Sequence, residues 1–253
     1  MENYTIPKNL LSKGTTNAKT VKNNLETFIL YLAPHKQNAK GVNVCPGASN
    51  GCVAACLYSA GRGKFSNVQK SRINKTNFYI YNKSLFVKKL ATEILREYTK
   101  AKKKGVKIAF RLNGTSDLDF VYLLQKYSNL DINTLKDVAT FYDYTKLVGK
   151  VQKYLNHPNY FVTFSRSENN ESTALSVLNM GGNVAAVFSN SLPNYWRGYK
   201  VIDGDKSDLE MLYNTNVVLG LKAKGDARKD KSGFVIESKK DILIKQFKIK
   251  QNE

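Results

Sequence analysis

Short apolar runs recur along the chain, and most are followed by a polar stretch and then by a helix-like pattern. The runs are rich in β-branched and aromatic residues, which favour strands over helices. They occupy residues 27–32, 106–112, 138–142, 160–164, 183–188, 199–202 and 217–221. We therefore predict a strand at each of these positions.

The most regular amphipathic pattern predicts a helix over residues 84–104. Leu85, Leu90, Ile94 and Leu95 fall on one face of it. A run of lysines followed by Gly105 is typical of a helix end. Weaker patterns predict further helices over part of 66–80 and over 120–127, 147–154, 171–179 and 206–213.

Strands that are apolar throughout and alternate with helices indicate a parallel sheet covered on both faces. The chain has no glycine-rich dinucleotide fingerprint. The pattern therefore predicts an α/β fold of one domain over residues 1–253, a full or partial parallel β/α barrel. A doubly wound open sheet is the alternative. We expect residues 1–26 to form a polar arm and residues 226–253 a charged tail on the surface.

Nearly every predicted strand runs into a dense polar cluster, where parallel α/β proteins bind their ligands. Turn chemistry and helix capping also explain such clusters one at a time. Basic side chains such as Lys146 and Arg166 are not helix caps, however, so the clusters together favour a site. The candidates are Asn113, Thr115, Asp117, Asp143, Tyr144, Lys146, Ser165, Arg166, Ser167, Glu168, Asp203, Asp205, Lys222 and Lys224.

Charge adds a candidate partner. Lys and Arg number 40 against 20 Asp and Glu, a formal net charge of +20 over 253 residues. This excess favours a polyanion, most simply nucleic acid or a phosphorylated substrate, although a lysine-rich, solvated surface is the plain alternative. No apolar run is long enough for a signal sequence or a membrane span, so we expect a cytoplasmic protein without membrane contact.

All the cysteines of the chain, Cys45, Cys52 and Cys56, lie in one glycine-rich stretch, residues 44–64, here named the cysteine loop. Three thiols cannot all pair, which argues against a disulfide scaffold. Because the loop follows the first predicted strand, it should open on the same rim as the polar clusters. If a helix begins near Cys52, then Cys52 and Cys56 share one of its faces.

Three readings of these thiols remain open. As thiolates they would hold an iron–sulfur cluster, with one iron left free because such clusters usually take four cysteines. A structural zinc site needs a fourth ligand, and His35 is the histidine within reach. Buried, unliganded thiols are the third reading. The first is favoured, which makes Cys45, Cys52 and Cys56 the predicted metal ligands.

A three-cysteine loop after the first strand of a β/α barrel resembles the radical S-adenosylmethionine enzymes. That resemblance implies a [4Fe-4S] cluster and bound S-adenosylmethionine. The spacing here is Cys-x6-Cys-x3-Cys, whereas that family usually has Cys-x3-Cys-x2-Cys.

A second resemblance covers roughly residues 25–235. The stretch Cys-Pro-Gly-Ala-Ser-Asn-Gly-Cys-Val-Ala-Ala-Cys-Leu-Tyr-Ser-Ala-Gly-Arg-Gly is similar to the opening motif of the phage-encoded gene product 88 family. Further similar motifs lie at residues 111–117, 141–146, 163–168, 181–184, 203–205 and 220–225. The resemblance implies a bacteriophage origin, hence a host-cell cytoplasm, and places the site on the polar rim.

Two hypotheses follow, and they are compatible with each other. In the first, the protein is an iron–sulfur protein with radical-S-adenosylmethionine-like chemistry, whose cofactor or substrate pocket is lined by Asn113, Thr115, Asp143, Ser165, Arg166 and Lys222. In the second, it binds or processes nucleic acid and its metal site is structural. A third hypothesis is a phage interaction protein whose cysteine loop is stabilised by zinc. The sequence assigns no catalytic residue.

Overall fold

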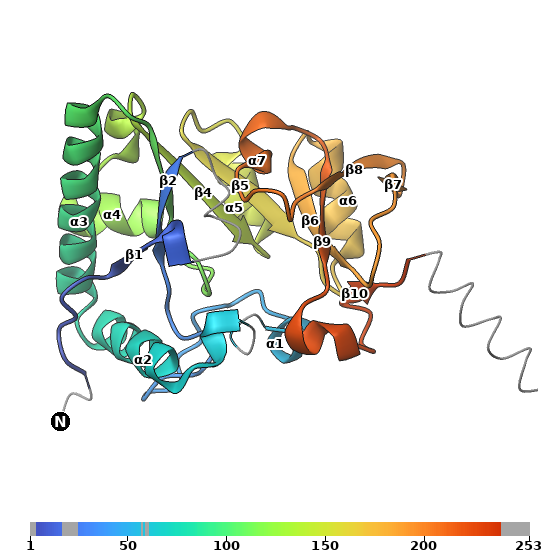
Figure 1. Cartoon of the computed structure of the whole chain (residues 1–253), viewed down its shortest axis with the longest axis horizontal. Helices are drawn as coiled ribbons and strands as arrows, with labels where there is room; N and C mark the ends of the chain where they lie inside the picture. The colour runs from blue at the N-terminus through green and yellow to red at the C-terminus, as the bar shows by residue number, and fades with distance from the viewer. Residues whose placement is uncertain (1–3, 17–24, 57, 59–60, 239–253) are drawn as a thin grey trace, which may run out of the picture.

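The structure is a computed structural model that describes residues 4–16, 25–56, 58 and 61–238. One mostly parallel sheet organises this part of the chain (Figure 1). Its strand order is β1-β2-β3-β4-β5-β6-β9-β8-β7, and β10 pairs with β6. The strands are β1 (Leu11–Lys13), β2 (Glu26–Leu30), β3 (Ile108–Arg111), β4 (Ala139–Thr145), β5 (Tyr160–Ser165), β6 (Asn183–Phe188), β7 (Tyr195–Trp196), β8 (Tyr199–Asp203), β9 (Val218–Lys222) and β10 (Val235–Ile236).

The helices connect these strands and cap one edge of the sheet. They are α1 (Asn50–Ala54), α2 (Ser66–Tyr81), α3 (Lys83–Lys104), α4 (Phe120–Ser128), α5 (Val148–Tyr154), α6 (Glu171–Asn179) and α7 (Glu210–Tyr213). Short 3-10 turns are η1 (Gly14–Thr16), η4 (Gly61–Lys64), η5 (Ile132–Leu135) and η6 (Gly225–Lys229). Every predicted strand corresponds to an observed one, and the predicted helix over 84–104 is α3.

The predicted parallel α/β fold is confirmed, but the sheet is not a closed barrel. The seven predicted strands all pair in parallel. Closure would require the last parallel strand to pair with the first. Instead β1 covers the outer edge of β2 in antiparallel orientation, β7 covers β8, and β9 lies between β6 and β8. The sheet is therefore open.

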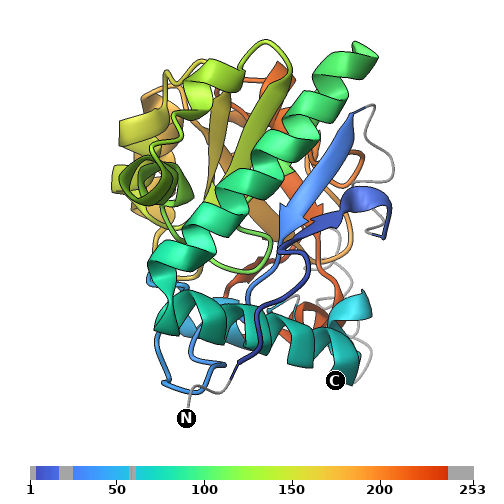
Figure 2. The same cartoon turned by 90° about the vertical axis from the view of Figure 1, so that its left-hand side faces the viewer.

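Alternation along the strands divides the core between two faces. Phe28, Phe110 and Phe141 point to one face, where they pack with residues of α3 and α4, and Phe164 and Phe188 continue this face against α5 and α6. Figure 2 shows α3 crossing it. On the other face, residues of β3, β4, β6 and β9 pack with α7 and the segment before it. Those residues are Ala109, Tyr142, Ala185, Leu219, Leu209 and Met211.

The segments expected to be an arm and a tail pack onto the sheet where they are described. β1 pairs with β2, and Leu10 is fully buried. Near the other end, Phe234 is buried and β10 adds to β6 in parallel. The polar arm is thus not free over residues 4–16, nor the tail over 226–238, because a few apolar side chains suffice to dock each segment. The remainder of both predicted segments lies largely outside the described residues.

A buried carboxylate, Glu93 of α3, holds the N-terminal segment in place. Its oxygens accept the main-chain N–H groups of Leu10 at 2.9 and 3.0 Å and of Leu11 at 2.9 Å. Lys75 of α2 donates to the carbonyl of Leu10 at 2.6 Å. These polar groups on α2 and α3 are buried because they bind backbone, which explains why α2 is a complete helix despite its polar sequence.

We expect Glu93→Gln to lower the free energy of unfolding by about 2 kcal/mol, since a neutral amide cannot accept all the amide hydrogens that the carboxylate accepts. Urea denaturation of the two proteins measures the difference. The matched control is Glu26→Gln, which removes an exposed ion pair with Lys13 and should cost less than about 1 kcal/mol. Equal costs for both variants would contradict this assignment.

Candidate functional site

The cysteine loop crosses the carboxyl edge of the parallel strands. Figure 2 shows the arrow of β2 pointing to the edge where α2 lies, and the loop joins these two elements. The N–H of Asp117, in the loop after β3, donates to the carbonyl of Val44 at 2.9 Å. The sulfur of Cys45 lies 3.6 Å from the carbonyl oxygen of Thr115. The loop therefore lies on the polar rim, as expected from its position after the first strand.

Two glycines let the loop approach the rim closely. A Cβ atom on Gly47 would lie 2.8 Å from Cβ of Lys146. A Cβ on Gly51 would lie 2.4 Å from Oγ of Ser232 and 2.8 Å from a carboxylate oxygen of Glu168. Such distances exclude a side chain, so these positions favour glycine for reasons of space.

Glu168, in the loop after β5, fixes the helix that carries Cys52. One of its oxygens accepts the N–H of Gly51 at 2.8 Å, and the other accepts the hydroxyl of Ser49 at 2.7 Å. Ser49 is also the N-cap of α1, since its Oγ accepts the N–H of Cys52 at 3.2 Å. Burial tends to raise the pKa of Glu168, but these hydrogen bonds and the charge of Lys146 outweigh it and lower the pKa.

The three thiols are half-buried, and the charges of neighbouring thiols act on Cys45 and Cys56. Burial first, and then the charges of Cys56 and Cys52, raise the pKa of Cys45 to about 12, although the N–H of His35 opposes the shift. Burial also raises the pKa of Cys52, against the charge of Lys146, and that of Cys56, against the N–H of Tyr58. The thiols thus share one neighbourhood at the rim.

The thiols do not yet form a ligand set. Among the described residues, no three His, Cys, Asp or Glu side chains stand close enough together to hold a metal ion. His35 contributes its main-chain N–H, which lies 3.3 Å from the sulfur of Cys45. The predicted metal ligands therefore remain a prediction, and binding would require the thiols to draw together.

Two of the predicted cofactor-binding residues are used inside the protein. The buried carboxylate of Asp143 accepts the main-chain N–H of Asn113 at 2.8 Å, its side-chain amide at 2.9 Å and the hydroxyl of Tyr160 at 3.0 Å. The side-chain carbonyl oxygen of Asn113 accepts hydrogen bonds from the main-chain N–H of Leu118 and from the hydroxyl of Ser116. Burial raises the pKa of Asp143. Asn113 and Asp143 hold the β3–α4 loop in shape.

Thr115 and Ser165 lie nearer the thiols. The carbonyl of Thr115 faces Cys45, as described, while its hydroxyl donates to the carbonyl of Leu32. The hydroxyl oxygen of Ser165 accepts a hydrogen bond from the ammonium group of Lys146 at 3.1 Å. Burial lowers the pKa of Lys146, although the neighbouring acidic groups, first among them Cys52, oppose this. Lys146 therefore places a cation beside the cysteine loop.

The remaining two predicted residues lie apart from one another. The guanidinium of Arg166 is buried and donates to the carbonyls of Gly233 and Phe234, and it pairs with Glu171 at 3.3 Å. It ties the C-terminal segment to α6. Lys222 is exposed, and only its main-chain N–H is anchored, by Asp205 at 2.8 Å. The structure does not gather all six predicted cofactor-binding residues into one pocket.

Sequence reasoning missed Arg72 of α2, which lies beside Cys56 and between the rings of Tyr31 and Tyr58. The signal that points to Arg72 is structural. The sequence of α2 is polar, yet the helix buries cations, and a buried cation needs a compensating interaction.

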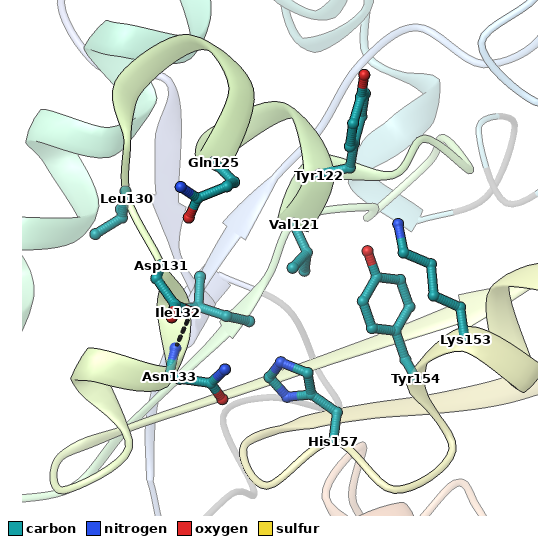
Figure 3. A pocket seen from close by; sticks show the side chains of 10 residues that line it. All are labelled: Val121, Tyr122, Gln125, Leu130, Asp131, Ile132, Asn133, Lys153, Tyr154 and His157. Atoms are coloured by element: carbon teal, nitrogen blue, oxygen red, sulfur yellow. Dashed lines mark hydrogen bonds between the residues drawn. The ribbon is translucent and has the colours of Figure 1, made fainter.

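Hollows lie at both edges of the sheet. One of about 370 Å³ borders α1 and is lined by Ala54, Ala55, Asp226, Lys229, Asp230, Lys231 and Ser232. Another of about 310 Å³ lies between α4, η5 and α5, where Figure 3 shows His157, Asn133 and Gln125 facing the space. Because β5 begins just after His157, this second hollow and its histidine lie at the amino edge, remote from the cysteines.

Fold and site together define the class: an open, mostly parallel α/β protein with a three-cysteine loop across the carboxyl edge of its sheet. The chain belongs to the gene product 88 family of bacteriophage proteins, whose family model matches residues 9–238. No curated protein and no solved structure matches the chain. The resemblance to radical S-adenosylmethionine enzymes is not supported, since the sheet is open and the family match does not extend to them.

In the part of the chain that the structure describes, no helix is long and apolar enough to span a membrane.

We expect Glu168→Gln to loosen α1 and so to expose Cys52. A loss of about 1.4 kcal/mol of local stability raises the rate of thiol modification about ten-fold. Alkylation followed by peptide mass spectrometry measures each cysteine separately. The control is Glu171→Gln, which changes ion pairs with Arg166 and Arg197 but leaves α1 untouched. Equal Cys52 rates in both variants would show that Glu168 does not anchor the helix.

Proposed function

We propose that this phage protein binds a thiophilic metal centre, an iron–sulfur cluster of the [4Fe-4S] type, through Cys45, Cys52 and Cys56. The observation that carries the proposal is that three half-buried thiols of one loop lie along the carboxyl edge of a parallel sheet. That edge is where α/β proteins place their ligands.

The electrostatics of the loop support a cation at this place. Once ionised, each thiol disfavours ionisation of its neighbours, and this repulsion contributes to the raised pKa of Cys45. A bound metal relieves that repulsion and releases the thiol protons. The N–H of His35 directed at Cys45 also fits, because metal-bound sulfurs commonly accept such hydrogen bonds and are tuned by them.

The number of thiols bears on what the centre does. Three cysteines leave one coordination position of a four-iron cluster for a substrate, a cofactor or water. Zinc is the alternative occupant and needs a fourth ligand, for which His35 is the candidate. S-adenosylmethionine remains a candidate cofactor of the open position, and equilibrium dialysis with the metal-loaded protein tests it.

Anaerobic purification with elemental analysis tests the proposal. We expect a brown protein with about four iron and four sulfide per chain. Each of Cys45→Ala, Cys52→Ala and Cys56→Ala should lose most of the iron, whereas Ser128→Ala, far from the loop in α4, should keep it. One zinc per chain would show that the site holds zinc and not an iron–sulfur cluster. A metal-free, colourless protein would refute the proposed function.

Nucleic-acid binding is the second candidate, and an exposed strip at the end of the cysteine loop and the start of α2 favours it. Arg62, Lys64, Phe65 and Lys70 are all exposed, Phe65 to 52%. The three cations form no ion pair with any residue that the structure describes. Cations beside an exposed aromatic ring suit a phosphate backbone and a stacked base, and the net charge of +20 acts in the same direction.

If this strip binds DNA, the double variant Lys64→Gln, Lys70→Gln should weaken binding of a single-stranded oligonucleotide and reduce the slope of log affinity against log salt by about 1 to 2. Lys88→Gln with Lys103→Gln, two exposed lysines of α3, is the charge-matched control and should change the slope less. Fluorescence anisotropy over a salt series provides the measurement. Absence of binding at low salt would reject the candidate.

A further inference from the structure

The guanidinium of Arg72 is a buried cation whose hydrogen-bonding capacity is largely unused. The residue is 9% exposed. Its Nε and Nη1 atoms donate to no acceptor within the described part of the chain. An arginine has five N–H donors and cannot give up its charge by deprotonation. A buried group of this kind calls for an explanation.

The other buried or half-buried lysines and arginines that the structure describes have hydrogen-bond acceptors. Lys75, one turn further along α2, binds the carbonyl of Leu10 at 2.6 Å. Arg111 pairs with Asp208 at 3.1 Å, and Lys150 binds the carbonyl of Leu118 at 3.0 Å. Arg166 binds two carbonyls and Glu171. Nε of Arg111 and Nε of Arg166 also lack an acceptor, but each of these arginines has a carboxylate partner. Among the described arginines, Arg72 has two such buried nitrogens.

Two aromatic rings flank Arg72 without satisfying it. Its guanidinium carbon lies 4.7 Å from the ring centre of Tyr31 and 5.7 Å from that of Tyr58. Such cation–π contacts are weaker than the hydration that a buried cation loses. After burial, the largest effects on the pKa of Arg72 come from Tyr31, Tyr58 and Cys56.

The surroundings of Arg72 are built to hold it in place. A Cβ on Gly114 would lie 2.5 Å from the ring of Tyr31, so the β3–α4 loop packs directly on that ring. On the helix side, the hydroxyl of Thr76 donates to the carbonyl of Arg72 at 2.8 Å and accepts the N–H of Ala33 at 2.8 Å. Thr76 thus joins α2 to the segment after β2, and the guanidinium of Arg72 lies beside Tyr31 of that segment and Tyr58 of the cysteine loop.

We propose that Arg72 binds an oxyanion group, a carboxylate or phosphate, of a small-molecule ligand that occupies the rim beside Cys56. Guanidinium groups recognise both oxyanions through directed, charge-assisted hydrogen bonds. A small molecule fits better than a nucleic-acid backbone, because a guanidinium this enclosed between two rings is out of reach of a duplex or a long strand. The inference deepens the proposed function, and the role of the ligand rests on that proposal: Arg72 would orient the ligand toward the metal centre.

Thermal unfolding of the purified full chain tests the oxyanion subsite directly. Phosphate and acetate are titrated separately against chloride at constant ionic strength, so that only specific binding shifts the midpoint. We expect a saturable rise with at least one of the two, and the more effective anion identifies the group. In Arg72→Gln the apparent affinity should fall at least ten-fold. Arg96→Gln removes an exposed cation of α3, outside both proposed sites, and should leave the response unchanged.

A response of equal size in Arg72→Gln, or no response to either anion in the wild-type protein, overturns the proposal. Stabilisation by an oligonucleotide alone overturns it as well. If Arg72→Gln does not fold, Arg72→Lys retains the charge but loses the planar fork, and it should bind more weakly. The Nε–H resonance of Arg72 in the wild-type protein should in addition move on anion binding, and a fixed resonance under saturating anion overturns the proposal.

Metal content is measured on the same samples and separates the two proposals. An anion response from a protein that contains no metal retains the subsite and refutes the metal centre. A loaded metal centre without any anion response retains the metal centre and refutes the oxyanion subsite.

Discussion

The whole site depends on the direction of the strands. Because β2 to β6 run parallel and lie side by side in chain order, each loop that leaves a strand emerges at the same edge. Residues far apart in sequence therefore meet there. Glu168, which follows β5, can hold Ser49 and Gly51 of a loop that follows β2. A closed barrel is not needed for this convergence, since neighbouring parallel strands suffice.

Polar residues at this edge serve two purposes that only their partners distinguish. Asn113 and Asp143 bind each other and the β3–α4 loop, so their hydrogen-bonding groups are occupied by the protein. Asp117 likewise accepts the hydroxyl of Thr145 at 2.7 Å and the N–H of Lys146 at 2.8 Å. Arg72 differs, because two of its nitrogen atoms bind nothing within the described chain. The first kind of residue shapes the rim, and the second kind is available to a ligand.

The cysteine loop combines firm anchoring with thiols that stand apart from one another. Glu168 and the close approach of Gly47 and Gly51 fix its first half to the rim. The thiols nevertheless do not converge to metal-binding distance among the described residues. A loop that is held at its base while its ligands remain separate suits a centre whose assembly orders the last part of the site, since metal binding and local folding are coupled.

The sequence by itself determined the local elements and the family. Runs of β-branched and aromatic residues specified seven of the parallel strands, an amphipathic pattern specified α3, and the cysteine motif indicated the gene product 88 family. Tertiary structure alone decided the rest. Whether the sheet closes depends on which strand takes each edge, and β1, β7 and β10 are too short to leave a pattern. The role of each rim residue depends on partners distant in sequence: Asp143 binds Asn113, whereas the guanidinium of Arg72 lies beside the rings of Tyr31 and Tyr58.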